Sequence, residues 1–220
     1  MNIDAIYLSN EGYVYCKSAF YSSADGLSMD TIYKFSPGIN KLFGEIDSGI
    51  WAASYILSMH KRNSDDFILF MPPCVKVNDF NMPLENFTNI SCYLDKSYPL
   101  FSNKIPVDKQ ILKGIKTNHL DVTVEEIREL FGIDEERIKR PLSGVGNEIF
   151  KAMCAIGYVN NKQVFCFPWM SQRRFESYHN HLTWVLDILD KLHMVVILPL
   201  GKDTGDGSED KDTGDGSVCK

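Results

Sequence analysis

The chain has 220 residues, 44% of them hydrophobic, and is therefore long enough to bury a substantial core in one domain or two lobes. Charged residues make up 24%, and the net charge of −6 argues against a general nucleic-acid binder, while six scattered cysteines without a C-x-x-C pair argue against a zinc site or a disulfide framework. Because no secretory signal pattern opens the chain and no apolar run approaches the ~20 residues of a membrane span, we expect a cytoplasmic protein with buried free thiols.

The first third of the chain is predicted to form mainly short strands. Apolar runs between turn-forming residues predict strands at Ile3–Leu8, Tyr13–Cys16, Thr31–Phe35 and, after Pro37 and Gly38, Ile39–Phe43. A run rich in aromatic and aliphatic residues predicts a buried helix over Ile50–Lys61, with Asp47 or Ser48 as its N-cap. Phe67–Met71 has the length and composition of a further strand and is stopped by two prolines.

The second half of the chain predicts helices that alternate with buried strands. Apolar residues at helical spacing predict an amphipathic helix over Val124–Phe131, and Thr123 with Glu126 forms a capping-box pair at its start. We expect residues 108–140 to lie in a helical subdomain inserted into a sheet domain. Further expected elements are a helix at Ile149–Ile156, a strand at Gln163–Phe167, a helix at His181–Leu192 and a strand at Met194–Leu198. This alternation implies βαβ units and an α/β core.

Three polar segments are given structural rather than functional interpretations. In the segment 201–220, Lys202–Ser208 recurs as Lys211–Ser217, and this glycine-rich, acidic composition predicts a disordered tail rather than a calcium loop. His179 and His181 predict a solvated loop or helix start in preference to a metal site, since no third ligand is near in sequence. Lys104 and the lysines from Lys109 to Lys116 predict a solvated basic helix face.

Residues 36–51, reading SPGINKLFGEIDSGIW, have the spacing of a phosphate-binding loop without its chemistry. Such a loop reads G-x-x-x-x-G-K followed by Ser or Thr, between a strand and a helix. Gly44 and Gly49 stand at the required spacing, with Asp47 and Ser48 between them. The position of the phosphate-binding lysine, however, is Ile50, and the position of the hydroxyl that would hold Mg²⁺ is Trp51.

Four later segments follow this stretch in a defined order. They read CYLDKSYPLF over 92–101, RPLSGVGNE over 140–148, VFCFPWMS over 164–171 and VVILPL over 195–200. Together with residues 36–51, the order and spacing resemble the nucleotide-binding domain of ABC transporters, over about residues 1–200. Each segment alone is a weak match, and the resemblance depends on all five.

The resemblance assigns a family position to residues in each segment. The Q-loop glutamine falls on Asp95 or Lys96. Leu142, Ser143 and Gly144 match the start of the L-S-G-G-Q signature, which then departs at Val145 and Gly146. The two Walker B acids fall on Pro168 and Trp169, and the switch histidine falls on Pro199 or Leu200.

The resemblance implies a P-loop NTPase-like ABC ATPase fold for a single domain over residues 1–200. Its parts would be a mixed sheet core with N-terminal antiparallel strands and a helical subdomain at about 102–142. The departures imply a pseudo-ATPase, because phosphoryl transfer depends on positioning and charge neutralisation by the groups that are missing. We therefore expect no catalytic residue, no metal ligand and no nucleotide bound by the chain's own loop. Ile50, Trp51, Pro168 and Trp169 would instead fill the former pocket, with Trp51 packed against Trp169.

The resemblance leaves several functions open. The first is a non-hydrolysing or regulatory subunit of an ABC transporter, partnered by an active ABC ATPase, a membrane permease or a second copy of itself, in the cytoplasm or at the inner face of the membrane. In that case Ser143 and the amides of Gly144–Gly146, aided by the following helix N-terminus, could complete an ATP–Mg site held by the partner. The alternatives are a stand-alone regulatory or scaffold protein, and an ATP-binding protein with an atypical site that stacks the base on an aromatic such as Tyr13.

Overall fold

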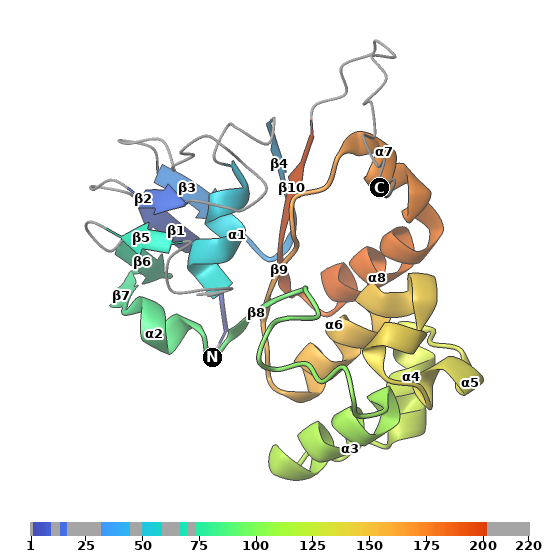
Figure 1. Ribbon diagram of the computed structural model, residues 1–220. Coiled ribbons are helices and arrows are strands. Elements are labelled where there is room, and N and C mark those ends of the chain that lie inside the picture. The colour runs from blue at the N-terminus through green and yellow to red at the C-terminus, as the bar shows by residue number, and fades with distance from the viewer. Residues whose placement is uncertain are drawn as a thin grey trace, which may run out of the picture.

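The computed structural model describes residues 2–9, 14–16, 32–44, 50–58, 67–69 and 74–201, and for 14–16, 51 and 67–69 only the backbone. Within these residues the strands form three sheets, and helices lie beside and below them (Figure 1). A parallel sheet runs through the middle of the molecule, an antiparallel sheet lies on one side of it, and most of the helices lie on the other.

The parallel sheet positions the candidate site. Its strands are β4 (Gly38–Phe43), β10 (Val195–Leu200), β9 (Val164–Cys166) and β8 (Ser91–Tyr93), in that order across the sheet. All neighbours are parallel, and Val195 stands opposite both Gly38 and Val164. Every residue of β10 is buried, as expected for a central strand of a sheet covered on both faces.

Helices cover both faces of the parallel sheet. Helix α1 (Ile50–Ser58) contacts β8, β9 and β10 from one side, and α6 (Ile149–Val159) and α8 (His179–Lys191) lie on the other (Figure 1). Helix α6 approaches the sheet closely at Gly157, where an added Cβ would stand 2.8 Å from a ring carbon of Phe165 and 3.2 Å from the sulfur of Cys92. The short helix α7 (Gln172–Ser177) connects β9 to α8.

The antiparallel sheet has the order β3-β1-β6-β7. Its strands are β1 (Ile6–Ser9), β3 (Ile32–Phe35), β6 (Cys74–Val77) and β7 (Phe80–Met82), and helix α2 (Leu84–Phe87) follows β7. A separate antiparallel pair joins β2 (Val14–Cys16) to β5 (Phe67–Leu69). One face of the larger sheet is buried through Ile6, Leu8, Phe35, Val75 and Val77, and Lys34 and Lys76 on the other face are exposed.

The helical region lies between β8 and β9 in the sequence. It comprises α3 (Val107–Thr117), α4 (Val124–Phe131), α5 (Glu135–Ile138) and the 3₁₀ turns η2 (Leu142–Gly144) and η3 (Gly146–Glu148), which lead into α6. Thr123 caps α4, with the Thr123 hydroxyl accepting from the Glu126 amide and the Glu126 carboxylate accepting from the Thr123 amide. Gly132 ends the helix in the left-handed conformation at φ 61°.

Most of the elements expected from the sequence are present, with shifted ends. The amphipathic helix over Val124–Phe131 and its capping box are confirmed. The expected strand at Ile3–Leu8 is instead Ile6–Ser9, and α8 begins two residues before His181. Strands β6, β7 and β8 were not predicted from the sequence. Tyr13, Thr31, residues 59–61 and the tail from Lys202 onward lie outside the described residues.

Two further expectations concern cysteines and membrane spans. Cys92, Cys154 and Cys166 are buried free thiols, as predicted, whereas Cys74 is only half-buried. In the described part of the chain, no helix has both the length and the apolar character needed to cross a membrane.

Candidate functional site at the carboxyl ends of the parallel strands

The four parallel strands end at one edge of the sheet, and ligands of open α/β folds bind at such an edge. Gly44 follows β4 and Gly201 follows β10, and the two segments are joined by a hydrogen bond from the Gly44 amide to the Leu200 carbonyl at 3.0 Å. Residues after β9 complete the edge, because the Gly201 amide donates to the Met170 carbonyl at 2.8 Å. This edge therefore brings together Gly44, the first glycine of the phosphate-loop pattern, and the Walker B position.

Trp169 fixes the geometry of this edge. Its indole Nε1 donates a hydrogen bond to the carbonyl of Gly44 at 3.1 Å, across a sequence separation of 125 residues. Its ring also lies close to Gly201, where an added Cβ would stand 3.2 Å from Cζ2 of Trp169. An indole thus connects three segments at the position where the resemblance would place an acid.

The segment after β9 carries no ionisable group at this edge. Phe167 and Met170 are buried, and Pro168 and Trp169 are partly buried between them. A phosphate-transfer site needs a carboxylate here to hold Mg²⁺ or orient water, and none of these four side chains can do so.

The first turn of α1 likewise lacks a charge. Helix α1 begins at Ile50, which is partly buried, and its first turn contains no acidic residue. The side chain of Trp51 and all of Asp47, Ser48 and Gly49 lie outside the described residues, so the expected contact between Trp51 and Trp169 stays a prediction.

The residues at the Q-loop position form a turn after β8. The carboxylate of Asp95 accepts hydrogen bonds from the amide and the hydroxyl of Ser97, at 2.9 and 2.6 Å. Lys96 is exposed, and its carbonyl accepts a hydrogen bond from Asn103. Asp95 therefore stabilises its own turn.

At the switch-histidine position the chain is still in β10. Pro199 and Leu200 are both buried, and Pro199 has no amide hydrogen. The Pro199 carbonyl accepts a hydrogen bond from the Met170 amide, so the side of Pro199 that would carry an amide hydrogen faces the β9 side of the sheet. The ladder between β10 and β9 ends two residues earlier, at Ile197. Proline is tolerated in this central strand because the ladder with β9 has already ended there.

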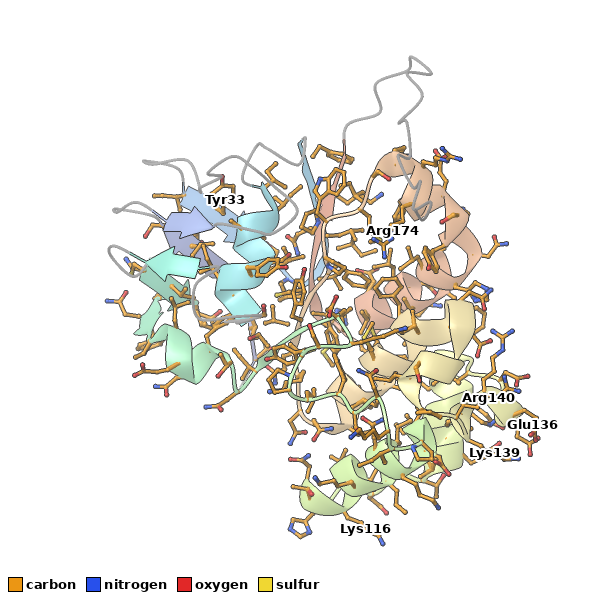
Figure 2. The ribbon with its side chains drawn as sticks, viewed as in Figure 1. Tyr33, Lys116, Glu136, Lys139, Arg140 and Arg174 are labelled. Carbon is orange, nitrogen blue, oxygen red and sulfur yellow. The ribbon has the colours of Figure 1, made fainter. Side chains whose placement is uncertain are left out.

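The signature-like segment is an exposed 3₁₀ turn between α5 and α6. Leu142 and Val145 are buried anchors, whereas Ser143, Gly144 and Gly146 are exposed. The Gly144 amide donates to the Pro141 carbonyl at 2.7 Å, and Gly146 has a φ of 64°, a conformation that glycine adopts without strain. Figure 2 shows the neighbouring Arg140 among the helices, far from the carboxyl ends of β4 and β10. The chain does not bring its own signature-like turn to Gly44 at the end of β4.

A carboxylate stands at the start of the helix that follows this turn. Helix α6 starts at Ile149, and the residue before it is Glu148, a buried carboxylate that accepts from the Asp134 amide at 3.1 Å. This negative charge opposes the attraction of the helix N-terminus for a phosphate. The sequence did not suggest this role for Glu148.

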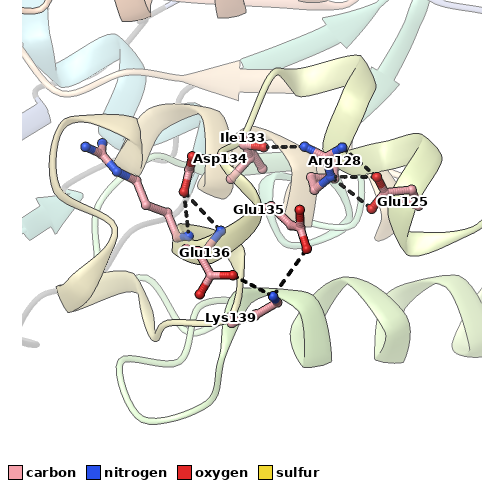
Figure 3. Close-up of polar contacts among 8 residues, drawn as sticks. Glu125, Arg128, Ile133, Asp134, Glu135, Glu136 and Lys139 are labelled. Atoms are coloured by element: carbon pink, nitrogen blue, oxygen red, sulfur yellow. Dashed lines mark hydrogen bonds and ion pairs between the residues drawn. The ribbon is translucent and has the colours of Figure 1, made fainter.

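A polar network around α4, α5 and η3 was also missed from the sequence. Figure 3 shows part of it: Arg128 is paired with Glu125, the Asp134 carboxylate caps α5, and Lys139 is paired with Glu135 and Glu136. Arg137 and Asn147 extend the network to His181 of α8. The sequence does carry local signals for part of this network: the Asp134 N-cap pattern, and the spacing of three or four residues within the Glu125–Arg128, Glu135–Lys139 and Glu136–Lys139 pairs. The contact of Asn147 with His181 joins residues 34 positions apart and has no such signal.

The buried thiols near β8 and β9 are not candidate nucleophiles. Burial raises the pKa of Cys92 to about 12, and burial also raises the pKa values of Cys154 and Cys166. Thiolates are the reactive form of cysteine, so these three side chains act as apolar core residues. In the described residues, no cluster of three acidic, histidine or cysteine side chains could hold a metal ion.

Comparison with solved structures identifies the fold. The chain superposes on a putative ABC transporter ATP-binding protein from Pyrococcus furiosus with a TM-score of 0.58, 13% identity, and coverage of 91% of this chain and 92% of that one. It superposes on the ATP-binding cassette MJ0796, in a dimeric post-hydrolysis state with ADP and phosphate, with a TM-score of 0.56, 9% identity, and coverage of 91% and 89%. A bacterial Atm1-family ABC exporter with ATP bound gives a TM-score of 0.58 and 9% identity, over 92% of this chain and 35% of that one.

The protein therefore has the fold of an ABC transporter ATP-binding domain, as the five sequence segments predicted. No protein-family model matches the sequence, and no curated protein matches it either. At identities this low the similarity establishes the fold, and the function has to be argued from the site.

Proposed function

We propose that the protein is a non-hydrolysing ABC-type subunit, which works with an active ATPase of the same fold. The observation that carries the proposal is the hydrogen bond from Trp169 to Gly44. It joins the Walker B position to the phosphate-loop stretch, as in an ATP site, through a neutral indole.

The positions that correspond to an ATP site lack the charged groups that phosphoryl transfer needs. Phosphoryl transfer requires a lysine or arginine near the phosphates, Mg²⁺ and a residue that orients water. The chain offers Ile50, Pro168 and Trp169 at the corresponding positions. Removing one group that stabilises a transition state typically costs about 3–4 kcal/mol, and here several are absent together.

The exposed turn at Ser143–Gly146 supports a role in a composite site. It lies far from the chain's own sheet edge, so it could contact only a nucleotide held by another subunit. The proposed partner is an ATPase with an intact phosphate loop, and a membrane permease would couple to the pair. The buried Glu148 implies that the hydroxyl of Ser143 and the turn amides, rather than the N-terminus of α6, would make this contact.

Calorimetric titration of the full chain with ATP and Mg²⁺ tests the first part. We expect no binding, and we expect the double variant Ile50→Lys, Trp51→Ser to gain measurable affinity without turnover. The matched control is Ile50→Gln, Trp51→Ser, which restores the hydroxyl without the charge. Tight binding with turnover by the unaltered chain would refute the proposal.

The second part is tested in a complex reconstituted with an ATP-hydrolysing partner. Ser143→Arg is expected to lower hydrolysis by about tenfold or more, because a bulky side chain would enter the composite site. Thr117→Arg, an exposed position at the end of α3, serves as the control. If Ser143→Arg leaves hydrolysis unchanged, the turn does not complete a partner's site.

A further inference from the structure

The side-chain amide of Asn147 bridges α5 and α8. Its carbonyl oxygen accepts a hydrogen bond from Nη1 of Arg137 at 2.5 Å. Its nitrogen lies 2.7 Å from Nε2 of His181, the third residue of α8. Asn147 follows the signature-like turn directly, so this bridge ties the end of the turn to α8.

The chemistry of the three groups fixes the direction of both hydrogen bonds. A guanidinium only donates, so the oxygen of Asn147 must face Arg137 and its NH₂ group must face His181. Nε2 of His181 therefore accepts, which requires a neutral imidazole with its proton on Nδ1.

Glu148 and Asp134 hold the other side of the bridge. Glu148 accepts from the Asp134 amide, and its second oxygen lies 3.7 Å from Nη1 of Arg137. These contacts keep Arg137 beside Asn147. The amide of Asn147 consequently cannot rotate by half a turn without placing its NH₂ group against the guanidinium.

We propose that His181 is a pH-sensitive positioning residue for the signature-like turn. Protonation turns Nε2 from an acceptor into a donor that faces the NH₂ group of Asn147, and the bridge between η3 and α8 opens. The bridge requires a neutral imidazole and is lost when the imidazole binds a second proton.

The surroundings contain charges of both signs. Helices α4, α6 and α7 and strands β4 and β10 pack against α8. Their charged or titratable groups are Glu125, Glu126, Arg128 and Glu129 of α4, Lys151, Cys154 and Tyr158 of α6, Arg173, Arg174 and Glu176 of α7, and Lys41 of β4. Tyr178 and His179 stand at the start of α8, and Arg137 and Glu148 meet it through Asn147. Arg128 of α4 is ion-paired with Glu125.

This device goes beyond the proposed function and does not rest on it. It requires only that the turn is held by Asn147, whatever the turn contacts. The experiment is accordingly made on the isolated full chain, without nucleotide.

The test is nuclear magnetic resonance between pH 5.5 and 7.5. In the unaltered chain we expect the side-chain NH₂ signals of Asn147 to shift with pH. We also expect the hydrogen-exchange protection of the Gly144 amide, corrected for intrinsic exchange, to fall by about fivefold to tenfold at the lower pH. His181→Gln provides an acceptor that does not titrate and should make both signals insensitive to pH. His179→Gln, the matched control, should keep the response of the unaltered chain.

Two results would overturn the proposal. The first would be that the Asn147 and Gly144 signals do not respond to pH in the unaltered chain, or that they still respond in His181→Gln. The other is read on the unaltered chain alone and so does not depend on a variant's folding: ¹⁵N imidazole spectra at pH 8 should show His181 protonated on Nδ1, and protonation on Nε2 would contradict the bridge.

Discussion

Replacement of Trp169 by Phe tests how the sheet edge is held together. The change removes the hydrogen bond from Nε1 to the buried carbonyl of Gly44, which then has no partner from this side chain. Leaving a buried acceptor unsatisfied costs about 1–3 kcal/mol, and the smaller ring leaves additional space beside Gly201. For a domain of this size we expect a melting temperature lower by about 3–8 °C.

Thermal unfolding followed by circular dichroism measures the change in melting temperature, and urea denaturation measures the change in free energy of unfolding. Trp184→Phe is the matched control, since Trp184 is 49% exposed and is expected to contribute less than about 1 kcal/mol. If Trp169→Phe destabilises the chain no more than Trp184→Phe, the indole of Trp169 does not hold the strand ends together. The proposal that Trp169 takes the place of a Walker B acid beside Gly44 would then lose its main support.

Three further predictions concern packing, titration and helix capping. Gly157→Ala should lower the free energy of unfolding by about 1–3 kcal/mol in urea denaturation, because the new Cβ would stand 2.8 Å from a ring carbon of β9. Thr123→Ala should cost about 1 kcal/mol through loss of the α4 capping box, and Thr123→Ser should recover most of it. For the buried thiols Cys92, Cys154 and Cys166, the raised pKa values mean that unfolding releases protons at alkaline pH. The free energy of unfolding should therefore be constant below about pH 8.5 and fall as the pH rises toward 12. The fall should be smaller in Cys92→Ala, and equal alkaline slopes in the two proteins would contradict this assignment.

The parts of the fold that depend on local pattern were predictable from the sequence. Helix α4 and its cap are encoded within a few residues, by Thr123, Glu126 and the apolar spacing that follows. Strands β9 and β10 are continuous apolar runs, which is typical of buried parallel strands. Strands β6, β7 and β8 were missed because they are only three or four residues long and depend on neighbours from distant parts of the chain.

The candidate site was predictable in its composition and less so in its contacts. The absence of a lysine at Ile50 and of acids at Pro168 and Trp169 can be read directly from the sequence. The expected contact of Trp169 with Trp51 stays a prediction, and the sequence did not predict the two contacts that the structure shows, with the carbonyl of Gly44 and with Gly201. A backbone carbonyl carries no sequence signal, so such a contact becomes visible only in three dimensions.

The sequence by itself determined which chemical groups this protein has at the positions of an ATP site, because residue identity fixes charge and hydrogen-bonding capacity. It also determined the fold class, through the order and spacing of five weak segments. Only the tertiary structure decided which of these segments meet. The parallel register of β4, β10 and β9 brings Gly44 to Trp169, and the packing of α8 beside η3 brings His181 to Asn147. Both contacts join residues more than thirty positions apart, and a separation of that kind is bridged by sheet and helix packing rather than by any local pattern.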